Sequence, residues 1–537
     1  MVTGACIIGL CFLIYRWTAR ILAKGSLVHK LPIAPKEESS WLWGHELQIF
    51  KHQVCDRYLT WASKLGTMYR LKPALFQPDA VGSIKLPYKQ LLTKVDQIAV
   101  LDNAAMHHIF QNAYVYVKAP AHRPLFAKLL GRGLAWAEGD EHRYQRRLLS
   151  PAFTTSSTKD MSDDIFKCAE TLINRLNARI VAEKQTRPIL NIMPMISTCS
   201  LDMIGRVAFG FDFGAGETAE AKKILQSWKQ DVALAHTFGG FFAPILINLL
   251  PWITKIPIPA LHTDGAAKQV SIKIGNDILR QNKGVSQGKD ILSLLAAESG
   301  KNPGKERLST TEILENMSTI IMAGHETTSV TVSFTLLRLA RNMEAQEKLR
   351  QEIQSAGRLD HDTIVSLPYL DAVVREGIRL HPPISRTDRV ALQDDVIPLS
   401  RPIVTSDGEA LTSLTIKAGQ VFHIPFIGPN VDTQTWGHDA NEFRPERWFD
   451  STRVPSSKDS PHGPWISISS FCDGPRSCIG WRLALLETKV IVGLLIRHFE
   501  FGNTAAEIEA YPSPTLQPFT YGEGGKMPLF VKVVQEP

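Results

Sequence analysis

The chain has 537 residues, of which 44% are hydrophobic and 21% charged, and its formal net charge is +7. This composition is typical of a folded globular protein and excludes a collagen-like, coiled-coil or globally disordered chain. The positive charge is mild for this length and forms no long basic run, so nucleic acid is not an expected partner. The seven cysteines are scattered, and we expect reduced thiols in a cytosol-facing body rather than a disulfide framework.

The N-terminus carries an uncharged apolar segment, residues 4–15, which is shorter than the ~20 residues that a spanning helix needs. The basic residues of this region all follow it: Arg16, Arg20, Lys24 and Lys30. Such a charge distribution places the remaining chain in the cytosol, and the lack of a small-residue cleavage site disfavours a removed signal peptide. We therefore expect residues 1–30 to form a single retained membrane anchor.

Residues 31–50 contain Pro32 and Pro35 and are predicted to form a stiff linker, with one domain over residues 51–537. Short strands are expected between residues 71 and 117, and helical periodicity dominates from 139 to 380. Strands and loops follow residue 382, and a further helix is expected over residues 479–498. The pattern predicts a mainly α fold with a minor β portion.

Two loops are expected within the helical part, at residues 238–261 and 299–309. The first overlaps residues 232–254, which contain no Asp, Glu, Lys or Arg. Pro244, Pro251 and adjacent glycines disfavour one continuous helix there. Two interpretations remain open: an apolar surface that dips into a bilayer, or a buried connection.

A long apolar helix is predicted between Ser309 and Asn342, and it opens with a capping box that ends at Glu312. Its middle reads AGHETTS, where Glu326 and Thr327 interrupt the apolar run. Burial of a carboxylate among apolar neighbours is costly, so this position indicates a functional site or a wet cavity. A transmembrane helix is disfavoured because it would carry several consecutive polar residues.

The segment FCDGPRSCIG, residues 471–480, is a Gly- and Pro-containing loop that leads to an apolar helix. It places Cys478 at the start of that helix and close to Arg476 in sequence. Free amides at a helix N-terminus and a nearby cation stabilise a thiolate. The pattern therefore indicates a metal ligand or a nucleophile at Cys478, whereas an isolated cysteine is usually a buried filler.

A helix is predicted from Pro368 to His381, with proline in its first turn and a stop at the following Pro-Pro pair. Glu376 and Arg379 are three residues apart and share one face of this helix. A surface ion pair is the ordinary explanation of such spacing.

Taken together, these motifs resemble the cytochrome P-450 family of haem-thiolate monooxygenases, and the sequences of the loops most resemble those of fungal members. The resemblance implies the cytochrome P-450 fold, with haem b as the cofactor and Cys478 as the axial ligand of its iron. Phe471 and Arg476 would belong to the same haem-binding loop, with Arg476 on a propionate. Cys472 departs from the small or polar residue that usually follows this Phe.

The resemblance also assigns roles on the long helix. Gly324 would leave room for dioxygen, whereas Thr327 and Glu326 would deliver protons for O–O bond cleavage. Glu376 and Arg379 would form a buried structural triad with Arg447 of the sequence PERW. This triad would support the fold and take no part in turnover.

Three further residues are candidate haem-binding groups by resemblance: His142, Arg146 and Arg389. Arg146 matches the arginine of a family motif in which a Trp usually stands at the position of His142. For Arg389, an exposed turn arginine is an equally good explanation.

The resemblance implies insertion of one oxygen atom from O2 into a lipophilic secondary metabolite or xenobiotic. Electrons would come from NADPH through a cytochrome P-450 reductase, and the protein would be a monomer anchored in the endoplasmic reticulum membrane. Two alternatives stay open: a haem-thiolate peroxide isomerase or dehydratase that needs no reductase, and a non-catalytic haem sensor. Substrate contacts are expected at residues 114–134, 238–261, 316–327, 383–386 and 516–520.

Overall fold

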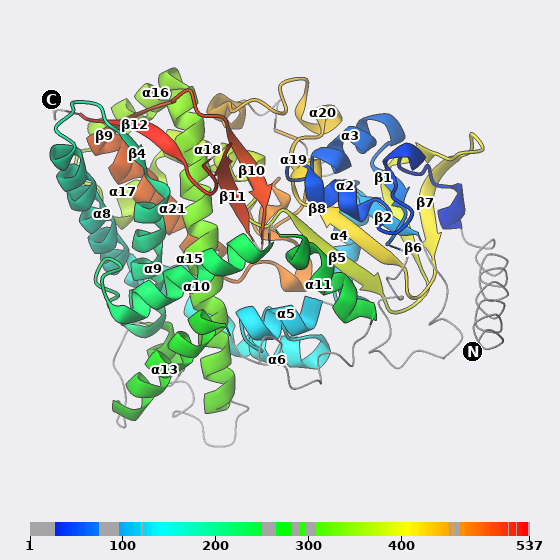
Figure 1. Cartoon of the computed structure of the whole chain (residues 1–537), viewed down its shortest axis with the longest axis horizontal. Helices are drawn as coiled ribbons and strands as arrows, with labels where there is room; N and C mark the ends of the chain where they lie inside the picture. The colour runs from blue at the N-terminus through cyan, green and yellow to red at the C-terminus, as the bar shows by residue number, and fades with distance from the viewer. Residues whose placement is uncertain are drawn as a thin grey trace.

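The computed structural model describes residues 27–74, 96–119, 122–235, 237–249, 265–281, 290–295, 308–450, 454–455, 461–465, 467–513, 515–521 and 523–534. Helices dominate one side of the molecule, and the strands of the largest sheet gather on the other, as Figure 1 shows. The α-helices are α2 (Glu46–Lys51), α3 (Asp56–Leu65), α4 (Asn103–Gln111), α5 (His122–Leu129), α6 (Gly139–Leu149), α7 (Thr155–Asp160), α8 (Ser162–Ala182), α9 (Met193–Phe209), α10 (Ala219–Ala235), α11 (Phe238–Leu249), α13 (Ala266–Gln281), α15 (Thr310–Arg341), α16 (Met343–Ser355), α17 (His361–Ser366), α18 (Pro368–Leu380), α19 (Ile427–Asn430), α20 (Thr433–Trp436) and α21 (Trp481–His498).

Short 3₁₀ helices connect these elements: η1 (Leu27–Lys30), η2 (Lys36–Glu38), η4 (Ser150–Phe153), η6 (Pro445–Phe449), η7 (Ser469–Phe471) and η8 (Gly474–Arg476). The strands are β1 (Met68–Leu71), β2 (Gln97–Val100), β3 (Tyr116–Lys118), β4 (Ile189–Asn191), β5 (Arg386–Ala391), β6 (Asp395–Val404), β7 (Ala410–Ile416), β8 (Val421–Pro425), β9 (Phe499–Gly502), β10 (Ile508–Pro512), β11 (Leu516–Thr520) and β12 (Pro528–Val533).

The largest sheet has the strand order β1-β2-β8-β5-β3 and is antiparallel except between β2 and β8. Smaller sheets pair β4-β12-β9, β10-β11 and β6-β7. This mainly α architecture with a minor β portion is the predicted fold class.

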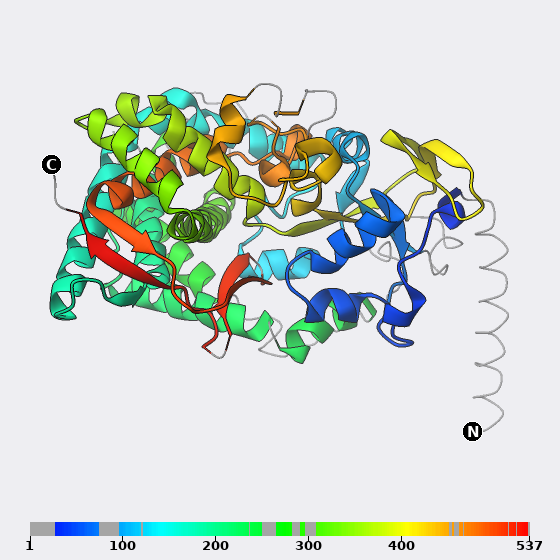
Figure 2. The same ribbon diagram turned by 90° about the horizontal axis from the view of Figure 1, so that it is seen from above.

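Helix α15 runs through the middle of the helical side and is seen end-on in Figure 2. Its N-terminus has the predicted capping box, in which Ser309 accepts from the Glu312 amide and the Glu312 carboxylate accepts from the Ser309 amide. It packs against α9, α13, α18 and α21. Because 22 of its 32 residues are buried, an exposed residue in its middle marks a special surface.

Residues 27–50 differ from the expectation, which placed residues 27–30 in the anchor and residues 31–50 in a stiff linker. Residues 1–26 lie outside the described residues, but Val28 in η1 is buried. Leu31 and Ala34 are also buried, and Ile33 forms a parallel bridge with Arg70 of β1. Residues 31–50 are therefore part of the folded body rather than a free linker, because their apolar side chains complete the core beneath the first sheet.

The first predicted loop is partly helical, because α11 occupies residues 238–249 and continues through Pro244. Pro244 therefore does not end this helix. The rest of the predicted loop, residues 250–261 with Pro251, lies outside the described residues. Of the second predicted loop, residues 299–307 also lie outside them. In the part of the chain that is described, no helix has both the length and the apolar character needed to span a bilayer.

Candidate haem site

Cys478 lies in a loop that is closed by a backbone hydrogen bond, in which its amide donates to the Phe471 carbonyl at 2.8 Å. Its side chain is exposed, unlike those of Cys55, Cys168 and Cys199. Helix α21 begins only at Trp481, so Cys478 precedes the first helical turn in which it was expected. Desolvation by the surrounding chain raises the pKa of the Cys478 thiol above its ordinary value, whereas a backbone hydrogen bond from Gly480 and the charge of Arg146 act in the opposite direction and favour the thiolate.

The loop turns sharply between Phe471 and Cys478. Cys472 has a φ of 58° and Gly474 a φ of 66°. A β-carbon at Gly474 would lie 2.3 Å from the Phe110 carbonyl oxygen of α4, so only glycine fits this close approach. Phe471 is half-buried, and its ring centroid lies 6.1 Å from that of Trp465.

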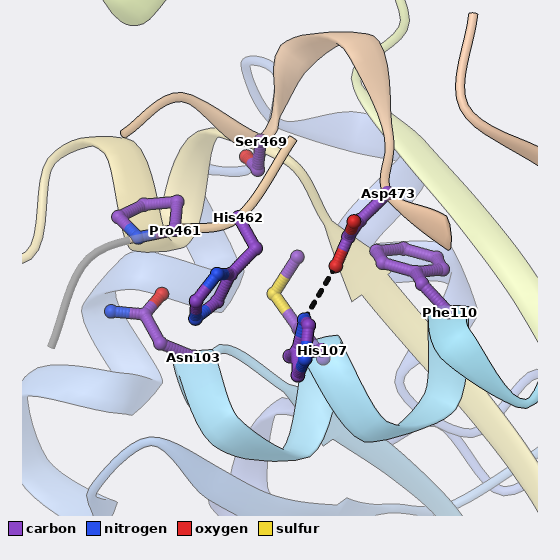
Figure 3. A pocket seen from close by; sticks show the side chains of 8 residues that line it. Asn103, His107, Phe110, Pro461, His462, Ser469 and Asp473 are labelled. Carbon is purple, nitrogen blue, oxygen red and sulfur yellow. Dashed lines mark hydrogen bonds and ion pairs between the residues drawn. The ribbon is translucent and has the colours of Figure 1, made fainter. Parts of the chain in front are cut away.

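Asp473 fastens this loop to α4, as Figure 3 shows. Its carboxylate accepts from the Gly474 amide at 2.6 Å, caps η8, and pairs with Nδ1 of His107 at 2.6 Å. The ring of His462 lies 4.2 Å from that of His107 across a small pocket. The Cys478 loop is thus held from the side of α4 as well as from α21.

A group of cations lies beside the loop. Arg476 pairs with Glu138 and donates to the Ala137 carbonyl at 3.0 Å, and Lys118 of β3 lies 3.4 Å from the same Glu138 carboxylate. Burial lowers the pKa of Lys118 to about 7 against the attraction of Glu138, and the charges of Arg476 and Arg389 lower it further. Two cations, Arg476 and Lys118, share one carboxylate here, and Nε of Arg476 is buried without a hydrogen-bond partner among the described residues.

Arg389 is buried in strand β5, so it is not the exposed turn arginine that was the alternative. It donates to the Asp388 carbonyl at 3.0 Å and to the Thr387 hydroxyl. Its guanidinium lies 5.7 Å from the centre of the Phe110 ring.

Helix α6 brings two more predicted residues to the same place. Arg146 donates to the carbonyl of Ser477, next to Cys478, at 2.5 Å. His142 is buried and hydrogen-bonds to the Tyr114 hydroxyl at 3.1 Å. Burial lowers the pKa of His142 to about 3, and the nearby cations, Arg476 first, contribute, so this ring is neutral near pH 7.

On α15, Ala323 is exposed and Thr327 half-buried, although they lie in the middle of a core helix. The two are one helical turn apart, and the Thr327 hydroxyl donates to the Ala323 carbonyl at 2.5 Å. Glu326, next to Thr327, is buried, and its carboxylate accepts from the Gln517 amide of β11 at 3.2 Å. Burial raises the pKa of Glu326 to about 7, partly offset by this hydrogen bond.

Gly324 has a packing role that the sequence did not indicate. A β-carbon there would lie 2.8 Å from Cδ1 of Ile204, so the glycine lets α15 approach α9 closely. Its proposed role beside dioxygen stays a prediction.

The three side chains of the expected triad, Glu376, Arg379 and Arg447, are fully buried. Nη2 of Arg379 lies 2.7 Å from Oε1 of Glu376, and Nε of Arg447 lies 3.4 Å from the same oxygen. A fourth residue, Asp439, pairs with Nη1 of Arg447 at 2.9 Å. Burial alone would raise the pKa of Asp439, but hydrogen bonds from Arg447 and Arg444 lower it to about 2.

Glu487 is a buried carboxyl of α21 that the sequence interpretation missed. It accepts a hydrogen bond from the Thr328 hydroxyl at 2.9 Å and thereby connects α21 to α15. Burial raises its pKa to about 8, so it is mostly protonated at neutral pH. An acidic residue in an apolar helix is the signal that singled out Glu326, and it would have found Glu487 as well.

Comparisons with known proteins identify the class to which this site belongs. The family model of cytochrome P-450 matches residues 90–513. Cytochrome P-450 monooxygenase claQ of Ampulloclitocybe clavipes is 30% identical over 502 residues, which cover 89% of this chain and 88% of that protein. Cytochrome P-450 monooxygenase 128 of Postia placenta is 29% identical over 520 residues, which cover 92% and 91% of the two chains. The chain therefore belongs to the cytochrome P-450 family and is an oxygenase.

The residues of the site fit the haem that this family implies. The exposed thiol of Cys478, which lies just before the start of α21, would hold the iron of a haem. The positive charges of Arg476, Lys118 and Arg389 suit the two carboxylates of a porphyrin. The buried Nε of Arg476, which has no hydrogen-bond partner among the described residues, is a free donor for such a carboxylate.

Proposed function

We propose that this protein inserts one oxygen atom of O2 into a lipophilic substrate, with electrons from an NADPH-dependent reductase. The observation that supports this most directly is the buried Glu326, with its pKa near 7, beside the half-exposed Thr327. A general acid works best when its pKa lies near the operating pH. Neither a peroxide isomerase nor a haem sensor needs such a proton donor, so these alternatives account less well for the pair.

In this proposal each residue has one task. Haem b, when bound, supplies the iron at which dioxygen is activated. Cys478 would hold the iron, Arg476, Lys118 and Arg389 would neutralise the propionates, and Arg146 would fix the loop through Ser477. Glu326 would give its carboxyl proton towards the hydroxyl of Thr327, whose own proton can leave the Ala323 carbonyl.

The substrate is proposed to be lipophilic because the expected contact stretches meet at α15. Strand β11 contacts α15, and the Leu516 amide donates to the Pro383 carbonyl at 2.7 Å. This hydrogen bond brings residues 383–386 and 516–520 together, and Gln517 of the second stretch donates to Glu326 of α15 at 3.2 Å. A role in secondary metabolism or in xenobiotic oxidation is part of the same proposal.

We also propose that the protein is a monomer on the cytosolic face of the endoplasmic reticulum membrane. Besides the expected anchor, an apolar surface supports this: Trp41 is 83% exposed, Leu234 60% and Phe238 58%. Trp43 packs edge-on against Phe238, so this surface joins α11 to the N-terminal segment, which lie side by side in Figure 2. Exposed aromatic and aliphatic side chains of this kind favour insertion into a lipid interface.

The test is to express the chain with a cytochrome P-450 reductase and to screen lipophilic compounds for products that carry one added oxygen atom. In ¹⁸O2 the product should gain ¹⁸O. Conversion of organic peroxides without reductase or O2, together with no oxygenated product, would instead support the isomerase.

Thr327→Ala provides a sharper arm of the same test. Haem content should be unchanged, while product formed per NADPH falls by about tenfold to a hundredfold, because a positioned proton donor contributes on this scale or more. Thr331→Ala is the matched control, since Thr331 makes the same kind of bond one turn further along, at 2.8 Å to the Thr327 carbonyl. Equal coupling in both variants would contradict the role of Thr327.

A further inference from the structure

His325 precedes Glu326 on α15, and its ring is completely buried. Nε2 of this ring is hydrogen-bonded to the hydroxyl of Ser197 on α9 at 2.8 Å. Nδ1, at the other side of the ring, has no hydrogen-bond partner among the described residues. A buried nitrogen without a partner is costly and calls for an explanation.

The unpartnered Nδ1 faces the carboxyl group that the proposed function needs as an acid. It lies 3.8 Å from Oε1 of Glu326, slightly beyond hydrogen-bond distance, so a small side-chain rotation closes the gap. The other carboxyl oxygen, Oε2, accepts from Gln517. Gln517 and its partner Thr515 are both buried and carry no titratable group, so that side offers no proton.

Ser197 connects this arrangement to the outside of the core. Its side chain is half-buried, whereas His325 and Glu326 are buried. A Glu326 that has given up its proton must regain one, and Ser197 with His325 forms a path from the helix surface to a point 3.8 Å from the Glu326 carboxyl group.

We propose that Ser197 and His325 form a proton relay that reprotonates Glu326 from solvent, an inference that rests on the proposed function of Glu326 as the acid. In the relay, neutral His325 carries its proton on Nδ1 and accepts from Ser197 at Nε2. The Nδ1 proton passes to the Glu326 carboxylate, Nε2 takes the Ser197 proton, and Ser197 takes one from water. To return to its starting tautomer, the ring releases the Nε2 proton through Ser197 to water and takes a proton at Nδ1 from water after rotating about its Cβ–Cγ bond.

The protonation equilibria agree with this geometry. Burial lowers the pKa of His325 to about 4, so the ring rests neutral, and burial raises that of Glu326 to about 7. His325 therefore passes protons without retaining one, and Glu326 holds the proton until it is needed.

The experiment follows the Glu326 carboxyl itself in the resting haem protein, independently of turnover. The infrared C=O band of protonated Glu326, identified as the band missing in Glu326→Gln, shifts on transfer to D2O. At pH 6 we expect His325→Leu and Ser197→Ala to slow this exchange by at least about tenfold, since a positioned proton-transfer group contributes on that scale or more.

Ser200→Ala is the matched control. Ser200 lies on the same face of α9, but its hydroxyl donates to the main-chain carbonyl of His325 at 2.8 Å rather than to the imidazole ring. Exchange in this variant should match that of the wild type. If His325→Leu does not load haem, Ser197→Ala decides, because it removes one hydroxyl from a half-buried position.

Normal exchange in His325→Leu or Ser197→Ala would overturn the relay. Slow exchange confined to Gln517→Met would overturn it as well, because protons would then enter from β11. Failure of the proposed function looks different: Glu326→Gln would couple NADPH use to product as the wild type does, whatever the exchange rates are.

Discussion

At the scale of single residues, the described cysteines separate by environment. Burial raises the pKa of Cys55 and of Cys168 to about 12, so these thiols stay protonated. Desolvation also raises the pKa of Cys478, but its side chain is accessible, and a backbone hydrogen bond from Gly480 and the charge of Arg146 act in the opposite direction. Only an accessible thiolate can serve as a metal ligand, which favours Cys478.

Replacement of Cys478 by Ser should therefore abolish the red-shifted absorption band of the reduced, carbon-monoxide-bound protein. Cys472→Ser is the control within the same loop and should keep that band, since Cys472 is held at a positive φ on the α4 side. A Cys478→Ser protein that retains the band would show that another residue ligates the iron.

Glu487 makes a stability prediction with a definite sign. Its folded pKa of about 8 exceeds the ordinary value of 4.5, so between these values the folded state holds a proton that the unfolded state has lost. The stability that this carboxyl contributes is thus full below pH 4.5, falls as pH rises, and is lost above about pH 8.

Glu487→Gln keeps an acceptor for Thr328 but cannot ionise, so it should flatten this dependence. Denaturant unfolding at pH 6 and pH 8.5, followed by circular dichroism, should show a larger loss of stability at the higher pH for the wild type than for the variant. Parallel losses in the two proteins would mean that Glu487 does not titrate in this way.

At the scale of elements, α18 is fixed to the η6 segment by the buried charges of Glu376, Arg379 and Arg447. Nη1 of Arg379 also donates to the carbonyls of Asn430 and Ala440, at 2.7 and 2.6 Å. The guanidinium thereby holds several loop segments around one carboxylate. Removal of one partner leaves unpaired charge in a site that water cannot reach.

We therefore expect Glu376→Ala, Arg379→Ala and Arg447→Ala each to cost about 3–5 kcal/mol and to yield little haem-loaded protein. The double variant of Glu376 and Arg379 should cost less than the sum of the single variants, because the two share one interaction. Haem content and unfolding measure both effects. Normal yields of a slow Arg379→Ala enzyme would contradict a structural role. Lys348→Ala is a control at an exposed ion pair with Glu446 and should change stability little.

At the scale of the whole molecule, the proposed membrane surface rests on three exposed apolar side chains: Trp41, Leu234 and Phe238. Val28 and Leu31 are buried, so a truncation that spares the body must stop before residue 27.

The protein without residues 1–26 should still sediment in part with microsomes, because this surface retains affinity for lipid. Combining the truncation with Trp41→Ser and Phe238→Ser should release it into the supernatant, whereas Val181→Ser, another exposed apolar position, should not. Complete solubility of the truncated protein without detergent would show that the surface does not contact the membrane.

Local patterns in the sequence were enough to predict α15, α18 and the Cys478 loop. Ser309 and Glu312 cap α15 through neighbouring backbone groups, and the Pro-Pro pair after His381 ends α18 by steric exclusion. These effects act over a few residues, so they can be read without the fold. The family resemblance added the third charge of the triad, Arg447, which lies 68 residues beyond Arg379.

Only the tertiary structure decided what depends on distant neighbours. Proline did not prevent α11, and the close approach of Ile204 to Gly324 could not be foreseen from the sequence. The pairing of Glu487 with Thr328 and the line from Ser197 through His325 join residues far apart in the chain. Burial, and with it the pKa of each carboxyl, is a property of the packed elements together, which no local pattern specifies.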